Sequence, residues 1–230
     1  MVALLSAGIA PALALMSFFY LKDRFNTEPL LPIIRSFIYG ALLVFPIMFI
    51  QYAFSVENIG QSPLVSSFIL TGLLEEFFKW FIFIYTIYKF TAFDSVYDGI
   101  IYGVAISLGF ATLENILYLF AHGIEYAIGR AIFPVSSHAL FGVIMGYYLG
   151  KAKFNSTHSR AVMISALFIP VTLHGLYDYI LQIVPGGRWI YILIPFMVIL
   201  WLNGMKKVKV ANQPYIPICN QVKSENMTDL

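Results

Sequence analysis

Two adjacent glutamates, Glu75 and Glu76, stand in the middle of an apolar stretch and are followed by Lys79. In a helix, a lysine three or four residues further on can meet either carboxylate. One lysine neutralises one glutamate, so the second must share a proton or find another partner. Close carboxylates in a low dielectric push their proton affinities apart, which can make one a base near neutral pH. The alternative is an ion pair that fixes helix register.

Three further apolar stretches carry ionisable or polar residues of the same kind. Glu114 and Asn115 lie in one, and His138 follows two serines in the next. His174 and Asp178 are four residues apart, a spacing at which a carboxylate can orient an imidazole. A charge at mid-bilayer costs about 2.5–3.5 kcal/mol on insertion scales, so these residues are candidates for function. For His138 alone, a hydrogen-bonded core histidine is the simpler interpretation.

The elements that carry these residues are predicted to be membrane-spanning helices. The chain has 230 residues, 60% hydrophobic and 11% charged, whereas soluble domains carry about 25% charged residues. About 20 apolar residues cross a bilayer as a helix. The sequence therefore predicts an all-α, polytopic membrane helix bundle, and its formal charge of +2 gives no reason to expect nucleic acid as a partner. Its seven expected spans are 2–21, 36–54, 63–88, 98–121, 131–150, 161–184 and 189–205.

Basic residues predict the orientation of this bundle. With the N-terminus outside, eleven Lys and Arg residues fall in inner segments and only Arg130 and Arg188 in outer loops, which matches the excess of cytoplasmic positive charge in membrane proteins. We expect a membrane domain over 1–205 and a polar cytoplasmic tail over 206–230. The single cysteine, Cys219, falls in this tail, so the chain has no internal disulfide.

This orientation puts the buried acids and histidines at mid-depth or in the outer half of four different spans. Snorkelling residues would instead gather near the span ends, so we expect a shared, water-filled site that faces outward. The acids and histidines expected in or near solvated loops are Asp94, Asp98, His122, Glu125 and His158.

Small residues recur every four positions in two of the spans. Such rows let helix backbones approach closely. Gly142 and Gly146 could also mark a homodimer face. The two rows are Gly99, Gly103 and Ser107, and Gly142, Gly146 and Gly150.

The chemistry that these side chains suggest is peptide hydrolysis by an activated water. A carboxylate can act as the base, and a histidine can stabilise the oxyanion or protonate the leaving amine. Serine, cysteine and ordinary zinc peptidases are disfavoured, because their Gly-x-Ser-x-Gly and His-Glu-x-x-His motifs are absent and the only cysteine is in the tail. A metal held by His138, His174 and either Glu75 or Glu76 is chemically feasible.

Two other classes of protein remain open at this point. Buried Asp, Glu and His chains also mark proton or ion pathways, so a coupled transporter is the main alternative. Carriers usually have internal repeats and broken helices in matching positions, which this sequence lacks. A non-catalytic sensor or scaffold is the third alternative.

Four ordered motifs resemble those of the PrsW intramembrane proteases of Bacillus-like bacteria, over nearly the whole chain. The set is more distantly similar to CAAX-processing endopeptidases, which have Arg after their double glutamate and a histidine where this chain has Glu114. The motifs are Glu75-Glu76-x-x-Lys79, Phe110-x-x-x-Glu114-Asn115, His138 and His174-x-x-x-Asp178.

The resemblance implies a peptidase of the bacterial cell membrane with a defined substrate. PrsW-like proteins make the first, extracytoplasmic cut in a membrane-anchored anti-sigma factor such as RsiW. A second protease then cuts within the membrane, and an extracytoplasmic-function sigma factor is released in response to antimicrobial peptides and cell-wall damage.

Our hypothesis for the reaction assigns a role to each motif and requires no cofactor. Glu75 is the base for water, Glu76 orients it or shares its proton, and Lys79 balances the remaining charge. His174, held by Asp178, stabilises the oxyanion. The residues expected to complete the polar cavity are Glu114, His138 and Asn115, the last as a candidate donor to the substrate or the oxyanion.

Overall fold

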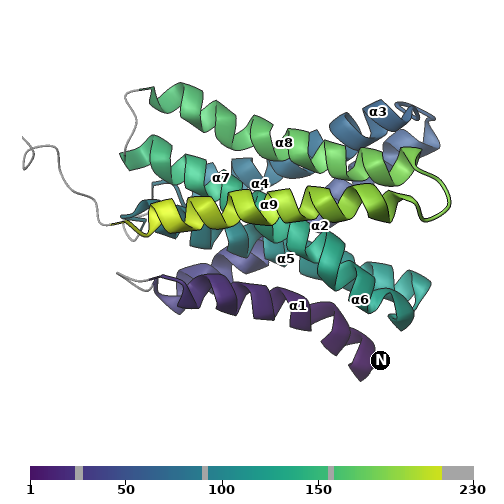
Figure 1. The fold of residues 1–230 in the computed structure, drawn as a ribbon, viewed down its shortest axis with the longest axis horizontal. Coiled ribbons are helices and arrows are strands. Elements are labelled where there is room, and N and C mark those ends of the chain that lie inside the picture. Colours follow the sequence, from purple (N-terminus) through teal and green to yellow (C-terminus); the bar gives the residue numbers. More distant parts are fainter. Residues whose placement is uncertain (24–27, 90–92, 155–157, 214–230) are drawn as a thin grey trace, which may run out of the picture.

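Apolar runs of about twenty residues or more form the long helices of the bundle, which Figure 1 shows side by side. The computed structural model describes residues 1–23, 28–89, 93–154 and 158–213. Six helical segments within these ranges are long and apolar enough to cross a membrane. They contain α1 (Val2–Leu21), α2 (Leu30–Val56), α5 (Val96–His122), α7 (Ser136–Phe154), α8 (Ser159–Ile183) and α9 (Trp189–Ala211).

The expected span over 63–88 is helical but divided. It consists of α3 (Pro63–Val65), a π-helix η1 (Ser66–Leu73) and α4 (Leu74–Thr86). A π-helix has a wider turn than an α-helix and occurs frequently at functional sites. Here it ends at Leu73, two residues before Glu75, so the wide turn leads into the first turn of α4, which carries both carboxylates.

The fifth span begins earlier than its predicted start at residue 131. A 3₁₀ turn η2 (Ile124–Tyr126), a short α6 (Ala127–Arg130) and a second π-helix η3 (Ala131–Val135) lead into α7. This segment is therefore helical. Arg130, which was predicted to lie in an outer loop, belongs to the helical bundle.

The central helix is α5, which is buried along nearly its whole length and packs against α7, α2 and α1. The two predicted rows of small residues face each other between α5 and α7. A Cβ atom at Gly146 would overlap the carbonyl oxygen of Gly99. Gly142 and Gly146 are thus buried inside the chain, and the suggestion that this pair forms a homodimer face is wrong.

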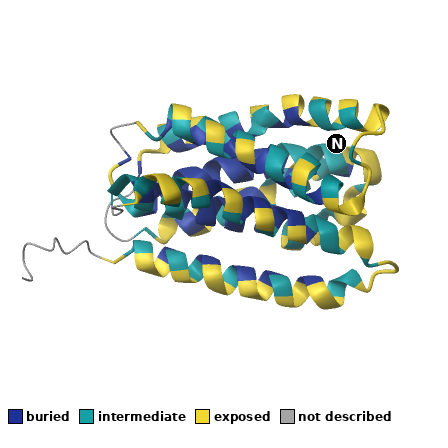
Figure 2. Ribbon diagram, turned by 90° about the horizontal axis from the view of Figure 1, so that it is seen from above, coloured by how far each residue is buried: buried dark blue, intermediate teal, exposed yellow. Residues whose placement is uncertain are grey.

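Exposed residues run along the outer helices of the bundle (Figure 2), and many of them are large and apolar. Phe49, Tyr85 and Leu202 are each more than 60% exposed. Apolar surface of this extent marks a region that another apolar medium covers. The protein is therefore a multi-pass membrane protein, with lipid around it and its ionisable residues inside.

The last helix, α9, continues to Ala211 and passes the expected end of the span at residue 205. Its final turns carry Lys206, Lys207 and Lys209. The predicted tail beyond residue 213 lies outside the described residues.

Candidate active site

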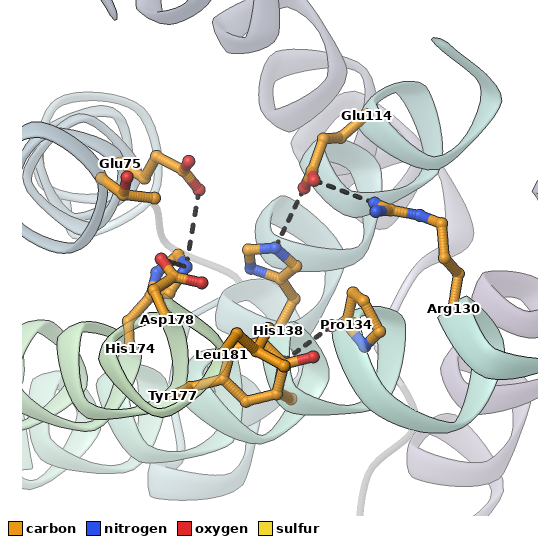
Figure 3. Close-up of a pocket in the computed structure, with 11 residues that line it drawn as sticks. Glu75, Glu114, Arg130, Pro134, His138, His174, Tyr177, Asp178 and Leu181 are labelled. Carbon is orange, nitrogen blue, oxygen red and sulfur yellow. Dashed lines mark hydrogen bonds and ion pairs between the residues drawn. The ribbon is translucent and has the colours of Figure 1, made fainter. Parts of the chain in front are cut away.

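Four helices meet around a small cavity, and both predicted histidines lie at it (Figure 3). The cavity has a volume of about 120 Å³. This is room for several waters, because one needs about 10–15 Å³ by this measure. It combines three carboxylates, two imidazoles and a guanidinium. The residues that line it are Thr71, Glu75, Glu114, Arg130, Pro134, Ser137, His138, His174, Tyr177, Asp178 and Leu181.

The two adjacent glutamates have different surroundings. Glu76 is fully buried and does not line the cavity, and its Oε1 lies 2.7 Å from the Nζ of Lys79, which is also fully buried. The distance from Lys79 Nζ to Glu75 Oε2 is longer, at 3.6 Å. Glu75 lines the cavity, and its Oε2 accepts no hydrogen bond from any described residue. Lysine therefore pairs mainly with Glu76, and Glu75 is the carboxylate presented to the cavity.

His174 stands among three carboxylates. Its Nδ1 lies 3.0 Å from Glu76 Oε1. On the cavity side, its Nε2 lies 3.5 Å from Asp178 Oδ2 and 4.0 Å from Glu75 Oε2. The predicted spacing on one helix thus brings Asp178 to His174 as expected. Glu76 adds a second orienting group from another helix: it is hydrogen-bonded to Nδ1, while Asp178 lies at ion-pair distance from Nε2.

His138 and Glu114 form a second pair on the opposite wall, where Figure 3 shows them pointing toward each other. His138 Nε2 lies 3.1 Å from Glu114 Oε2, and His138 Nδ1 lies 3.2 Å from Lys79 Nζ. Arg130 completes the group, with its Nη2 2.9 Å from Glu114 Oε1. Sequence reasoning missed Arg130, because it counted this residue among those of an outer loop and left open whether 122–135 is a plain loop or a short interfacial helix.

Gln51, from α2, is a second residue that was not predicted. Its Nε2 donates to Glu75 Oε1 at 3.3 Å and to the carbonyl oxygen of Leu70, in the π-helix, at 3.1 Å. A polar amide in an otherwise apolar span was a usable signal in the sequence. Gln51 holds the carboxylate of Glu75 relative to the helix that carries it.

Asn115 does not have the position expected of a substrate or oxyanion donor. It is fully buried and does not line the cavity. Its Nδ2 donates to the carbonyl oxygen of Gly8 at 3.1 Å, and its Oδ1 accepts from Arg130 Nε at 2.8 Å. Asn115 therefore supports Arg130 from behind the cavity wall.

A second acidic group lies near the other end of α5. Asp98 is fully buried, contrary to the solvated environment expected for it, and forms a capping box with Ser95. Tyr102 donates a hydrogen bond to the side chain of Glu28, in the connection before α2, and burial raises the pKa of Glu28 to about 7. Sixteen residues separate Asp98 from Glu114, or about 24 Å of helix. This group is therefore separate from the cavity.

The chemistry of the donor groups also bears on metal binding. Glu75, Glu76, His138 and His174 each offer one ligand atom, and these atoms lie within 4.8 Å of one another. Imidazole and carboxylate are ligands that zinc uses. However, the ammonium of Lys79 is already hydrogen-bonded to two of the four groups, Glu76 and His138, and lies 3.6 Å from a third, Glu75. A metal held by all four would be repelled by this ammonium, so the set does not fit a metal while Lys79 is in place.

Comparison with known proteins identifies the family. Residues 28–202 match the model of a family described as PrsW family intramembrane metalloproteases. These residues include all four motifs that carry the predicted site. No solved structure matches the chain. Membership of a peptidase family decides against the transporter that the buried charges alone had left open.

Three relatives named Protease PrsW match over nearly the full length of both chains. The relative from Bacillus subtilis is 53% identical and covers 92% of this chain and 96% of its own. The relative from Oceanobacillus iheyensis is 55% identical, and the match covers 93% of this chain and 98% of the relative. The relative from Clostridioides difficile is 37% identical, with 88% of each covered. The chain therefore belongs to the PrsW family of intramembrane proteases and is a peptidase of the bacterial membrane.

Proposed function

We propose that this peptidase makes the first, extracytoplasmic cut in a membrane-anchored anti-sigma factor. The cut leads to release of an extracytoplasmic-function sigma factor during envelope stress. Two features support this: the resemblance of the four motifs to those of PrsW-like proteins, and the position of the cavity in one half of the bundle.

The cavity lies in the half of the bundle where α5 and α8 end and where α7 begins. Leu181 is in the last turn of α8, and Pro134 lies in η3, which directly precedes α7. The opposite ends of α7 and α9 carry Lys151, Lys153 and Lys206. Because cytoplasmic segments are enriched in Lys and Arg, the lysine-rich end faces the cytoplasm. The cavity then opens toward the outside, where a first cut before intramembrane cleavage is needed.

One observation carries the proposed chemistry. Lys79 is hydrogen-bonded to Glu76, whereas Glu75 Oε2, 3.6 Å from Lys79 Nζ, accepts no hydrogen bond from any described residue at a cavity that has room for water. A carboxylate in this position can take a proton from water within hydrogen-bond distance. Glu76, neutralised by Lys79, stays an acceptor for the Nδ1 hydrogen of His174.

The reaction then proceeds in two steps. Water gives one proton to Glu75, and its oxygen bonds to the carbon of the scissile carbonyl. His174, held by Glu76 and Asp178, donates the hydrogen on Nε2 to the resulting oxyanion, which stabilises it. Glu75 next delivers its proton to the amide nitrogen, the carbon–nitrogen bond breaks, and an acid and an amine are released. No step passes through a metal ion.

Mapping the cut in the substrate tests this proposal. The purified protein is placed in proteoliposomes with a full-length, membrane-anchored anti-sigma factor, and the fragments are identified by mass spectrometry. We expect a discrete cut on the extracytoplasmic side of the substrate's membrane span. A cut on the cytoplasmic side, or no cut in any anti-sigma factor of the same bacterium, would contradict the proposal.

A further inference from the structure

A chain of contacts runs from Lys79 to the surface of the cavity. Lys79 Nζ lies 3.2 Å from His138 Nδ1, and His138 Nε2 lies 3.1 Å from Glu114 Oε2. Glu114 Oε1 in turn lies 2.9 Å from Arg130 Nη2. Four residues from four helical segments are thus joined in one line, which Figure 3 shows from His138 to Arg130.

The contacts of His138 assign its tautomer. An ammonium group has only hydrogens to donate, so the Nδ1 of His138 must offer its lone pair to Lys79. The ring hydrogen is therefore on Nε2, where it is donated to Glu114. If the hydrogen moved to Nδ1, Lys79 would lose an acceptor and would meet a donor instead. The ring state of His138 thus controls how Lys79 is held.

Lys79 has to be held, because it lies between two competing carboxylates. It is 2.7 Å from Glu76 and 3.6 Å from Glu75. His138 and the ring of Phe110, whose centroid is 4.3 Å from Nζ, both lie against the ammonium. A shift of the ammonium toward Glu75 would neutralise the carboxylate proposed as the base.

Arg130 is fixed more firmly than a surface arginine. Besides Glu114, its Nε donates to Asn115 Oδ1 at 2.8 Å, and its guanidinium carbon lies 4.1 Å from the centroid of the Tyr118 ring. Its side chain is only 12% exposed. All three partners belong to α5, so the guanidinium is a rigid anchor at the end of the line.

We propose that Arg130 is a positioning residue for the peptidase. It holds Glu114, Glu114 fixes the Nε2-protonated tautomer of His138, and this tautomer keeps the ammonium of Lys79 on Glu76. Arg130 acts through these side chains and does not take part in bond making or breaking. The role of Glu75 in this inference rests on the proposed function, whereas the link from Arg130 to the ring state of His138 does not.

The first readout is independent of any substrate. Protein labelled with nitrogen-15 in histidine is compared by NMR as wild type, Arg130→Gln and Arg188→Gln, and His138→Gln identifies the resonances of His138. Arg188 is the matched control, because it is an exposed arginine whose Nε donates to the carbonyl oxygen of Pro185 and which does not line the cavity. We expect a single Nε2-protonated tautomer in wild type and Arg188→Gln, and a mixture of ring states in Arg130→Gln. The wild-type tautomer in Arg130→Gln would overturn the inference.

The second readout is the rate of cleavage of the mapped substrate. We expect kcat of Arg130→Gln to fall about 10- to 100-fold, by analogy with residues that orient the ligands of a metal site, with KM within about twofold of wild type. Arg130→Lys keeps a cation beside Glu114 and should recover part of the rate, which also shows that loss of folding is not the cause. Arg188→Gln should match wild type.

The third readout is a double-mutant cycle between Arg130 and Glu114. Because Arg130 acts through Glu114, we expect Arg130→Gln combined with Glu114→Gln to be no slower than the slower single variant. If the losses in kcat of the two single variants multiply in the double variant, or if Arg130→Gln has a wild-type kcat, the inference is overturned. If the wild type cuts no anti-sigma factor, the proposed substrate is wrong, and the NMR comparison still decides on Arg130.

Discussion

Adjacent residues on a helix point about 100° apart, and this separates the two glutamates into different roles. Glu76 turns into the bundle and meets Lys79 and His174, whereas Glu75 turns to the cavity. The sequence alone left open which of them is the base, because three- and four-residue spacings to Lys79 are both compatible with contact. The distances of 2.7 and 3.6 Å favour Glu75 as the base.

Gln51 offers a test of how Glu75 is oriented. We expect Gln51→Ala to lower kcat about 10-fold, as for other groups that orient a site residue, because Glu75 Oε1 loses its donor. The matched control is Gln61→Ala, since Gln61 is exposed and its Nε2 donates to the carbonyl oxygen of Ile59, outside the cavity. Cleavage rates of the two variants check this prediction, and equal rates would show that Gln51 has no such role.

The position of Lys79 leads to a prediction about metal ions. Its ammonium contacts Glu76 and His138, so we expect the purified peptidase to keep its activity after treatment with a strong chelator. Elemental analysis of the treated protein should find less than one equivalent of zinc, iron or manganese. If the chelator abolishes cleavage and one divalent metal restores it, Lys79 must move away and the metal-free mechanism is wrong.

The residues that sequence reasoning missed share a physical reason. Periodicity along one helix brought together Glu75 and Lys79, or His174 and Asp178, because both partners are on the same helix. Gln51 and Arg130 contact the site across helices, and no spacing in the sequence encodes that. Asn115 was adjacent to a true cavity residue, but a one-residue step turned it away from the cavity.

The helices themselves were predictable where hydrophobicity decides their existence. The wide turn of η1, the helical segment over 124–135 and the extension of α9 to Ala211 were not. These features depend on hydrogen-bond register and on packing between helices, which an apolar pattern does not specify. The two rows of small residues predicted close approach of helix backbones, and the structure confirms it where α5 packs on α7.

The close packing of α5 on α7 predicts a strong effect of a single methyl group. A Cβ at Gly146 would overlap backbone atoms of Gly99, whereas a Cβ at Gly129 would meet no atom within 4 Å. Overpacking of this kind costs about 1–3 kcal/mol. We therefore expect Gly146→Ala to lower the thermal unfolding midpoint in detergent by several degrees and Gly129→Ala to leave it unchanged. Equal midpoints would contradict the observed helix contact.

At the scale of the whole molecule, the orientation in the membrane decides which side the cavity serves. The only cysteine, Cys219, lies in the tail outside the described residues. If the C-terminus is cytoplasmic, a membrane-impermeant maleimide should label Cys219 only after the cells are permeabilised. Gln61→Cys in a Cys219→Ser background should be labelled in intact cells, because it lies between α2 and α3. The reverse pattern would place the cavity on the cytoplasmic side.

The central claim is that Glu75, presented to the cavity while Lys79 holds Glu76, activates the water that cuts the peptide. Its most direct test is the single-turnover rate of Glu75→Gln in proteoliposomes with the mapped substrate. Glu57→Gln is the control, because Glu57 is an exposed glutamate at the end of α2. General-base removal typically costs about 10²- to 10⁴-fold, so we predict a loss in this range for Glu75→Gln and a wild-type rate for Glu57→Gln. A correctly folded Glu75→Gln that cuts at the wild-type rate would contradict the account.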